Sequence, residues 1–293
     1  MYRVLRPFEY LKPNTVEEAV KALSAIKGET KVLAGGVDLI PKMRRREESP
    51  VRVVNIQGLP GLDHVETENT GALRIGALVS LRAVEQTLVV AKNYCCLYEA
   101  AHQIASVQVK TMGTLVGNLC VATPASDVAT ALLVLGAKLT IAGNDGGREV
   151  TIEEFFRGPG ETVLATHELV TNVVIPDVSA GTGSAFMNLT KTKADIAKVS
   201  VAVALTITEG VCQEIRIALG AVAPTPIRCA NAEAVLIGQN IQGNLVVEAA
   251  EMAAEACSPI TDIRSDADYR KDMVRVLSRR AIERARERAN VYH

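Results

Sequence analysis

Apolar residues near the N-terminus repeat with the spacing of an α-helix. Thr15 and Glu18 have the spacing of a capping box at the start of this repeat, and Gly28 is placed to end it. The pattern therefore predicts a first amphipathic helix. The residues on its apolar face are Val16, Ala19, Val20, Leu23 and Ile26.

A short run rich in apolar residues follows at residues 31–34 and leads directly into Gly35 and Gly36. A run of this length bounded by glycine is typical of a β-strand that ends in a tight turn. Asp38 is then placed as a helix N-cap, with Pro41 in the first helical turn. The unit predicted here is strand, glycine turn, helix.

Beyond this unit, apolar runs and capping signals predict further strands and helices without a regular alternation. Ser80, for example, is placed as an N-cap. The expected strands are residues 51–56, 73–79 and 168–175 with a hairpin of residues 138–142 and 148–152, and the expected helices are residues 81–86 and 94–104.

The composition and the pattern of predicted elements change near residue 178. Residues 178–183 are rich in Ser, Gly and Thr and are expected to form a connection. A long hairpin of residues 199–208 and 211–219 follows, and the chain after Ala230 is expected to be helical. Because the alternation is irregular and the later strands are antiparallel, the predicted fold class is α+β. The expected C-terminal helices are residues 232–238, 245–256 and 267–289.

Composition narrows the classes of function. The 293 residues carry 32 basic and 33 acidic side chains, and this balance argues against nucleic acid or an anionic membrane as the main partner. Six Tyr, four Phe and no Trp leave few aromatic rings to stack on single-stranded nucleic acid.

The longest uncharged stretch, residues 111–126, is too short to span a bilayer. The N-terminus has no apolar signal core, so we expect a cytoplasmic protein without membrane insertion.

The six cysteines follow no metal-ligand spacing. Cys95 and Cys96 are adjacent, the other four stand alone, and no Cys-x-x-Cys pair occurs. We therefore expect no metal site in this chain and interpret most of these cysteines as buried small hydrophobic residues.

The Gly35-Gly36 turn is the first candidate binding site. Main-chain N–H groups at a helix start, together with the helix dipole, form a site for a phosphate, and glycine allows close approach. The alternative is a plain tight turn. The Gly-x-Gly-x-x-Gly spacing of a Rossmann fingerprint is absent.

A second small-residue segment, residues 113–118, precedes Asp127 and an apolar run. Thr114 and Asn118 have side chains that can hydrogen-bond phosphate, and Asp127 can accept a hydrogen bond from a sugar or ribityl hydroxyl. The alternative is a buried turn in which Asp127 is the N-cap of the following helix. A basic run, Lys42 with residues 44–46, is either a docking or phosphate patch or the solvated end of a helix.

With these segments taken together, the chain resembles the FAD-binding medium subunit of the molybdenum hydroxylases, whose relatives include carbon monoxide dehydrogenase and xanthine dehydrogenase. The order and spacing of several short motifs carry the resemblance along nearly the whole chain. They are RPFEY at residues 6–10, VLAGGVDLIP at 32–41, RIGA at 74–77, GTLVGN at 113–118, PASD at 124–127, ADIAKV at 194–199, YR at 269–270 and RRA at 279–281.

The resemblance implies a two-part FAD-binding domain of the p-cresol methylhydroxylase type and a small C-terminal domain of antiparallel strands and helices. It places the FAD-binding subdomains at residues 1–57 and 58–177 and the C-terminal α+β domain at residues 178–293. It also implies FAD as the cofactor, with its pyrophosphate held by the two glycine segments. Asp127 would contact FAD hydroxyls, and Ile104, Leu169 and Val170 would line the flavin. Lys191 or Lys193 would be the basic residue that tunes the flavin. The residues implied for the pyrophosphate are Leu33, Ala34, Gly35, Gly36, Val37, Asp38, Leu39, Gly113, Thr114, Leu115, Gly117 and Asn118.

Two valines depart from the pattern of the family. Val37 stands where relatives often carry a polar side chain, and Val116 stands where they carry glycine. A branched residue rarely adopts positive φ, so Val116 either has an ordinary backbone conformation or narrows the phosphate loop. The two valines predict looser FAD binding than in relatives.

The resemblance further implies an oxidoreductase subunit without catalytic side chains of its own. It would take electrons from an iron–sulfur small subunit beside a molybdopterin large subunit, as a dimer of heterotrimers, and pass them to NAD or another acceptor. One alternative is a free-standing FAD-dependent oxidoreductase. The other is a cofactor-free scaffold subunit of the same fold, which Val37 and Val116 suggest.

Overall fold

The computed structural model describes residues 4–24 and 30–291. Two predicted features of the first helix, its fifth apolar residue Ile26 and its terminating Gly28, lie outside these residues. Helix α1 (Val16–Ser24) forms as predicted and buries Ala19, Val20 and Leu23. Thr15 Oγ1 accepts from Glu18 N–H at 3.1 Å, but the Glu18 carboxylate accepts from Asn14 N–H rather than Thr15 N–H. Half of the predicted capping box is therefore present, and in the other half the Glu18 carboxylate binds the N–H of the residue before Thr15.

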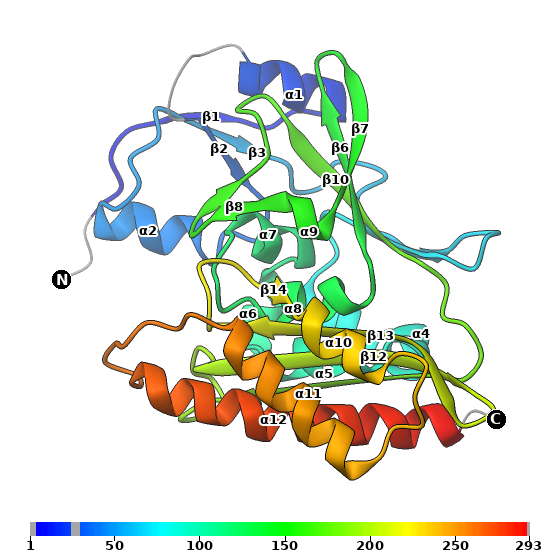
Figure 1. The fold of residues 1–293 in the computed structure, drawn as a ribbon. Helices are drawn as coiled ribbons and strands as arrows, with labels where there is room; N and C mark the ends of the chain where they lie inside the picture. Colours follow the sequence, from blue (N-terminus) through cyan, green and yellow to red (C-terminus); the bar gives the residue numbers. More distant parts are fainter. Residues whose placement is uncertain (1–3, 25–29, 292–293) are drawn as a thin grey trace.

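The N-terminal unit is a three-stranded parallel sheet (Figure 1). Its strands are β1 (Glu9–Leu11), β3 (Arg52–Asn55) and β2 (Thr30–Leu33), in that order. Consecutive parallel strands of one sheet need a crossover connection. Helix α1 supplies it between β1 and β2, and α2 (Leu39–Arg45) supplies it between β2 and β3. The predicted strand, glycine turn and helix are thus present between residues 30 and 45.

The second sheet has five antiparallel strands, and a set of short helices packs against it (Figure 1). In spatial order its strands are β4 (Val65–Thr67), β5 (Leu73–Gly76), β10 (Leu169–Ile175), β6 (Lys138–Gly143) and β7 (Gly146–Thr151). The helices are α3 (Leu81–Gln86), α4 (Leu88–Asn93), α5 (Cys95–Gln103), α6 (Val107–Met112), α7 (Leu115–Cys120), α8 (Asp127–Val134) and α9 (Ile152–Phe155), and the two-stranded sheet β8 (Phe156–Gly158) and β9 (Glu161–Thr162) follows α9.

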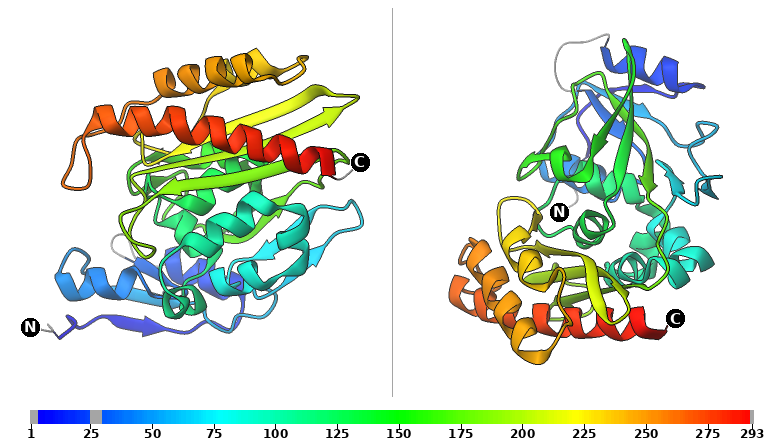
Figure 2. Two further views of the ribbon diagram at one scale, coloured as in Figure 1. Left: turned by 90° about the horizontal axis from the view of Figure 1, so that it is seen from below. Right: turned by 45° about the vertical axis from the view of Figure 1, so that its right-hand side comes forward.

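The C-terminal unit is a four-stranded antiparallel sheet with three helices. The strands are β11 (Thr182–Leu189), β12 (Val199–Thr208), β13 (Val211–Gly220) and β14 (Ile227–Arg228), and the helices are α10 (Ala230–Leu236), α11 (Gly243–Ala256) and α12 (Ala267–Val291). Helices α11 and α12 lie on one side of the sheet, and the helices of the second unit lie on the other (Figure 2).

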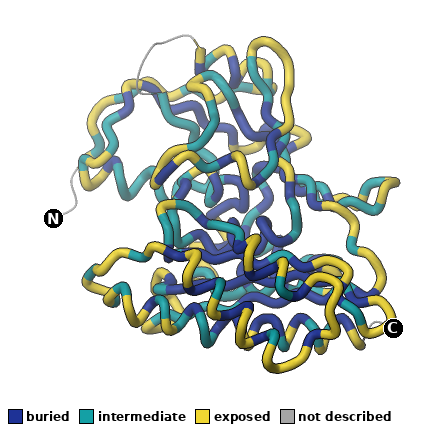
Figure 3. The backbone as a smooth tube through the Cα atoms, in the orientation of Figure 1, coloured by how far each residue is buried: buried dark blue, intermediate teal, exposed yellow. Residues whose placement is uncertain are grey.

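Strand β12 is buried on both faces, which explains its composition. Its odd-numbered positions from Val199 to Ile207 are large and belong to the core under the C-terminal helices, whereas Ala202 and Ala204 belong to the core shared with α5 and α8. Small side chains on that second face let helices pack close to the strand. Figure 3 shows this sheet as a continuous buried layer, with exposed residues on the outer turns of the helices below it.

The structure confirms the α+β class but corrects one prediction within it. Residues 178–183 were expected to be a connection, yet β11 begins at Thr182 and runs to Leu189. This strand has no clear apolar–polar alternation because both of its faces are largely covered. A Cβ at Gly183 would collide with the Ala285 carbonyl oxygen of α12, so glycine marks close packing here and not a loop. The division of the chain at residue 178 stays a prediction. Within the described part of the chain, no helix combines the length and apolarity needed to cross a bilayer.

A partly buried carboxylate joins the second unit to the C-terminal unit. Glu99 on α5 accepts hydrogen bonds from Arg288 on α12, at 2.6 Å, and from the main-chain N–H of Phe186 on β11, at 2.8 Å. Arg288 also donates to the Ser184 carbonyl oxygen. This ion pair therefore holds α12, the edge strand and α5 together.

We expect Glu99→Gln to lower the free energy of unfolding by about 1–3 kcal/mol, because the Arg288 guanidinium loses its charged acceptor in a half-buried site. Urea unfolding followed by circular dichroism measures the change. Glu251→Gln is the matched control, because it removes an exposed pair with Arg275 and should change the value by less than about 0.5 kcal/mol. Equal effects of the two substitutions would contradict the role given to Glu99.

Candidate functional site

The two glycine segments singled out in the sequence meet in space. The Gly35-Gly36 turn follows β2, and Gly113 lies between α6 and α7. A Cβ at Gly35 would collide with the Met112 carbonyl oxygen and lie 2.9 Å from the Gly113 Cα. Only a residue without Cβ permits this main-chain contact. Glycine at position 35 is thus required by the second segment, which lies far away along the chain.

A cavity of about 550 Å³ opens where the two segments meet. Residues 34–39 line it from the first segment, and Gly113, Thr114, Gly117 and Asn118 line it from the second. The predicted wall residues Ile104, Leu169 and Val170 also line it. The fold therefore brings thirteen of the seventeen predicted site residues to one cavity.

Four predicted site residues do not line this cavity: Leu33, Leu115, Asp127 and Lys193. Leu115 is fully buried in the core, and Lys193 is exposed in the loop between β11 and β12, as is Lys191. Whether these residues reach FAD stays a prediction.

The second segment begins a helix at the cavity wall. Thr114 is the N-cap of α7, and its hydroxyl accepts from Gly117 N–H at 2.9 Å. Asn118 Oδ1 accepts from the Ser126 hydroxyl at 2.5 Å. Val116 lies inside this short helix and is not among the residues with positive φ. Of the two alternatives for Val116, the ordinary backbone conformation is therefore correct.

Charged residues of the N-terminal unit lie at the cavity in pairs. Lys31 pairs with Glu48 at 3.0 Å, and Lys42 pairs with Asp38 at 2.9 Å. Asp38 is the N-cap residue of α2, as predicted, but its side chain makes no capping hydrogen bond. Of the basic run, Lys42 is the residue that lines the cavity.

Several lining residues were not among the predicted site residues, although the sequence analysis noted Lys42 in the basic run and Val116 in the second glycine segment. They come from strands, helices and loops, and most are apolar residues or parts of ion pairs. They are Lys31, Val32, Lys42, Glu48, Ile56, Ala77, Leu81, Val109, Val116, Cys120, Val121, Thr123, Gly160, Leu164 and Glu168.

Asp127 occupies the boundary between the second and C-terminal units. Ser126, not Asp127, is the N-cap of α8 and accepts from Ala129 N–H, so the alternative that made Asp127 the cap is wrong. Asp127 Oδ2 accepts from the Asn188 amide at 3.2 Å, whereas its buried Oδ1 has no partner. Burial raises the pKa of Asp127 to about 7, although the hydrogen bond from Asn188 opposes the shift.

Comparison with known families covers nearly the whole chain. The family model described as FAD binding domain in molybdopterin dehydrogenase matches residues 6–178, and the one described as CO dehydrogenase flavoprotein C-terminal domain matches residues 184–285.

Two curated relatives are similar along nearly their full length. The carbon monoxide dehydrogenase medium chain of Afipia carboxidovorans is 32% identical over 282 residues, which cover 96% of this chain and 98% of the relative. The xanthine dehydrogenase FAD-binding subunit of Escherichia coli O157:H7 is 30% identical, with 94% and 95% covered. Among solved structures, a chain of carbon monoxide dehydrogenase from Hydrogenophaga pseudoflava superposes with a TM-score of 0.94 at 33% identity, covering 97% of this chain and 99% of that one.

We expect Asp127→Asn to stabilise the protein at pH 8 by up to about 4 kcal/mol, since the raised pKa means that ionisation of the native carboxyl is unfavourable. The native state holds this proton more tightly than the unfolded state, so wild-type stability relative to the variant falls as pH rises from about 4 to about 7. Urea unfolding at several pH values, on protein stripped of bound ligands, measures the difference. A difference that does not change between pH 4 and pH 8 would contradict the assignment.

Proposed function

Because the chain belongs to the family of FAD-binding medium subunits of molybdenum hydroxylases, we propose that it carries electrons from an iron–sulfur subunit to NAD or another acceptor. Family membership itself confirms the predictions of an oxidoreductase subunit and of FAD as its cofactor. The direction of electron flow and the acceptor belong to the proposal.

The volume and lining of the cavity support this proposal. Its volume of about 550 Å³ lies within the roughly 300–1,000 Å³ of typical ligand sites. Glycine main chain on one side suits a diphosphate, and the apolar side chains of Ile104, Leu164, Leu169 and Val170 suit a flat ring system. When bound, FAD supplies one- and two-electron redox chemistry.

The contact between Gly35 and the Met112–Gly113 main chain carries this proposal. Two turns that meet without side chains between them, one after strand β2 and one between helices α6 and α7, present main-chain groups to one ligand. We propose that these turns hold the pyrophosphate and that the apolar walls orient the flavin and exclude water. Leu33, Leu115, Asp127 and Lys193 stay in the proposed site as residues whose contacts depend on the bound cofactor.

We propose no catalytic acid or base in this chain. Curated relatives are named as medium chains or FAD-binding subunits of dehydrogenases. By analogy we propose an iron–sulfur small subunit and a molybdopterin large subunit as partners, in a cytoplasmic dimer of heterotrimers. The proposed domains are residues 1–57, 58–177 and 178–293.

A cofactor-free scaffold is the weaker alternative. It was motivated by Val37 and Val116, but Val116 lies in a helix with ordinary backbone and does not distort the segment. Val37 is exposed, and its side chain lies near Gly113 at the cavity. Both valines line the cavity, which still has a volume of about 550 Å³.

We expect Gly35→Val to abolish FAD binding, because the new side chain collides with the Met112 carbonyl and separates the two turns. Flavin absorbance of the purified protein and fluorescence titration of the flavin-free protein measure the loss. Gly243→Val is the control, since a Cβ at that position meets no atom within 4 Å. Stoichiometric flavin in folded Gly35→Val protein would contradict the placement of the site.

Purification from the native host through a tag on this chain tests the proposed complex. We expect FAD, iron and molybdenum to co-purify with two further polypeptides. A yellow protein without partners would instead indicate a free-standing oxidoreductase, and a colourless protein that cannot be reconstituted would indicate a scaffold.

A further inference from the structure

A buried ion pair lies behind the cavity, between α3 and α6. Glu85 and Lys110 are 6% and 4% exposed, and their side chains meet at 2.8 Å. Arg82 donates to the same carboxylate at 2.9 Å, and His102 Nδ1 lies 2.7 Å from its other oxygen. Burial alone would raise the pKa of Glu85, but the hydrogen bonds from Lys110, His102 and Arg82 lower it to about 2. Neither Glu85 nor Lys110 lines the cavity.

The pair is connected to the wall that contains Ile104. Lys110 Nζ also donates to the His102 carbonyl oxygen at 3.0 Å and thereby ties α6 to the end of α5. The His102 ring is stacked on Tyr98, which orients it toward Glu85. Between His102 and α6 the chain makes a sharp corner, where Ala105 has a φ of 42°. A residue with a Cβ is unfavourable in that region, so the surrounding contacts must hold the corner.

The pair is also connected to the glycine segment. Glu85 and Leu81 both belong to α3, whereas Lys110 and Gly113 belong to α6 and its cap. The Gly113 carbonyl accepts from Leu81 N–H at 2.8 Å. Together, the ion pair and this hydrogen bond fix the position of α6 relative to α3 at two points. Any shift of α6 would move Met112 and Gly113 away from Gly35.

We propose that the Glu85–Lys110 ion pair, with His102, is a positioning element of the FAD site that sets the distance between the two glycine turns and holds Ile104 at the flavin wall. This inference rests on the proposed placement of FAD. A buried ion pair contributes little net stability compared with well-packed apolar residues, but its directional hydrogen bonds define one geometry. The three donors around Glu85 come from α3, the end of α5 and α6.

Lys110→Met and Glu85→Gln test the inference. Both variants are expected to raise the dissociation constant of FAD at least about tenfold, because α6 and the 104–106 corner lose their fixed position. The constant is measured by quenching of flavin fluorescence during titration of the flavin-free protein, and circular dichroism checks that each variant is folded. An unchanged constant in folded Lys110→Met protein would overturn the inference.

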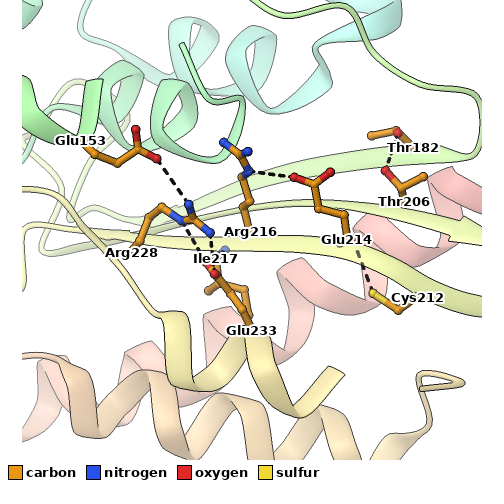
Figure 4. A network of polar contacts seen from close by, with 9 residues as sticks. All are labelled: Glu153, Thr182, Thr206, Cys212, Glu214, Arg216, Ile217, Arg228 and Glu233. Carbon is orange, nitrogen blue, oxygen red and sulfur yellow. Dashed lines mark hydrogen bonds and ion pairs between the residues drawn. The ribbon is translucent and has the colours of Figure 1, made fainter. Parts of the chain in front are cut away.

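Glu233→Gln is the matched control, because Glu233 is an equally buried, ion-paired glutamate remote from the cavity. Its carboxylate accepts from Arg228 and from Ile217 N–H in the C-terminal unit (Figure 4). We expect this variant to melt at a lower temperature but to bind FAD within about twofold of wild type. A weakening of FAD binding as large as that of Lys110→Met would overturn the inference, because general destabilisation would then explain both.

The double variant Glu85→Leu/Lys110→Met separates positioning from stability. Removing both charges avoids an unpaired buried charge, so the melting temperature should recover relative to Lys110→Met. We expect FAD binding to remain weak because the directional contacts are gone. Recovery of both properties would overturn the inference. If Gly35→Val also bound FAD normally, the proposed site itself would fail; normal binding by the Lys110 variant alone would reject only the positioning role.

Discussion

The site depends on one constraint, the close main-chain contact between Gly35 and Met112. The first turn is carried by a small parallel sheet, and the second by helices that cover an antiparallel sheet. Neither unit forms the cavity alone. The other elements of the first two units hold these two turns together.

The C-terminal unit supports these elements from outside the cavity. Its sheet presents Ala202 and Ala204 to the helices of the second unit, and Glu99 ties α5 to α12 through Arg288. Helix α5 leads into the corner at Ile104. The wall of the cavity is therefore connected, through one helix, to the hydrophobic core of the C-terminal sheet.

Two buried carboxylates show how their surroundings decide their charge. Glu85 receives hydrogen bonds or ion pairs from three side chains, and its pKa falls to about 2. Asp127 receives one hydrogen bond from Asn188 and leaves one oxygen unpaired, and its pKa rises to about 7. Burial raises the pKa of both carboxyl groups; at Glu85 the hydrogen bonds from Lys110, His102 and Arg82 outweigh it, whereas at Asp127 the neutral side chains of Asn188 and Ser200 do not. The well-satisfied carboxylate lies behind the cavity, and the poorly satisfied one lies at the boundary between units.

The sequence by itself determined the local elements and the candidate segments. Helical spacing identified α1, two long runs separated by Glu209-Gly210 identified the hairpin of β12 and β13, and small residues identified the turns around Gly35 and Gly113, because these signals arise from neighbours within a few positions. Only the tertiary structure decided that β11 is a strand and that Glu85 and Lys110 meet behind the wall. Those outcomes depend on burial and on contacts between distant residues, which no local period of the sequence records.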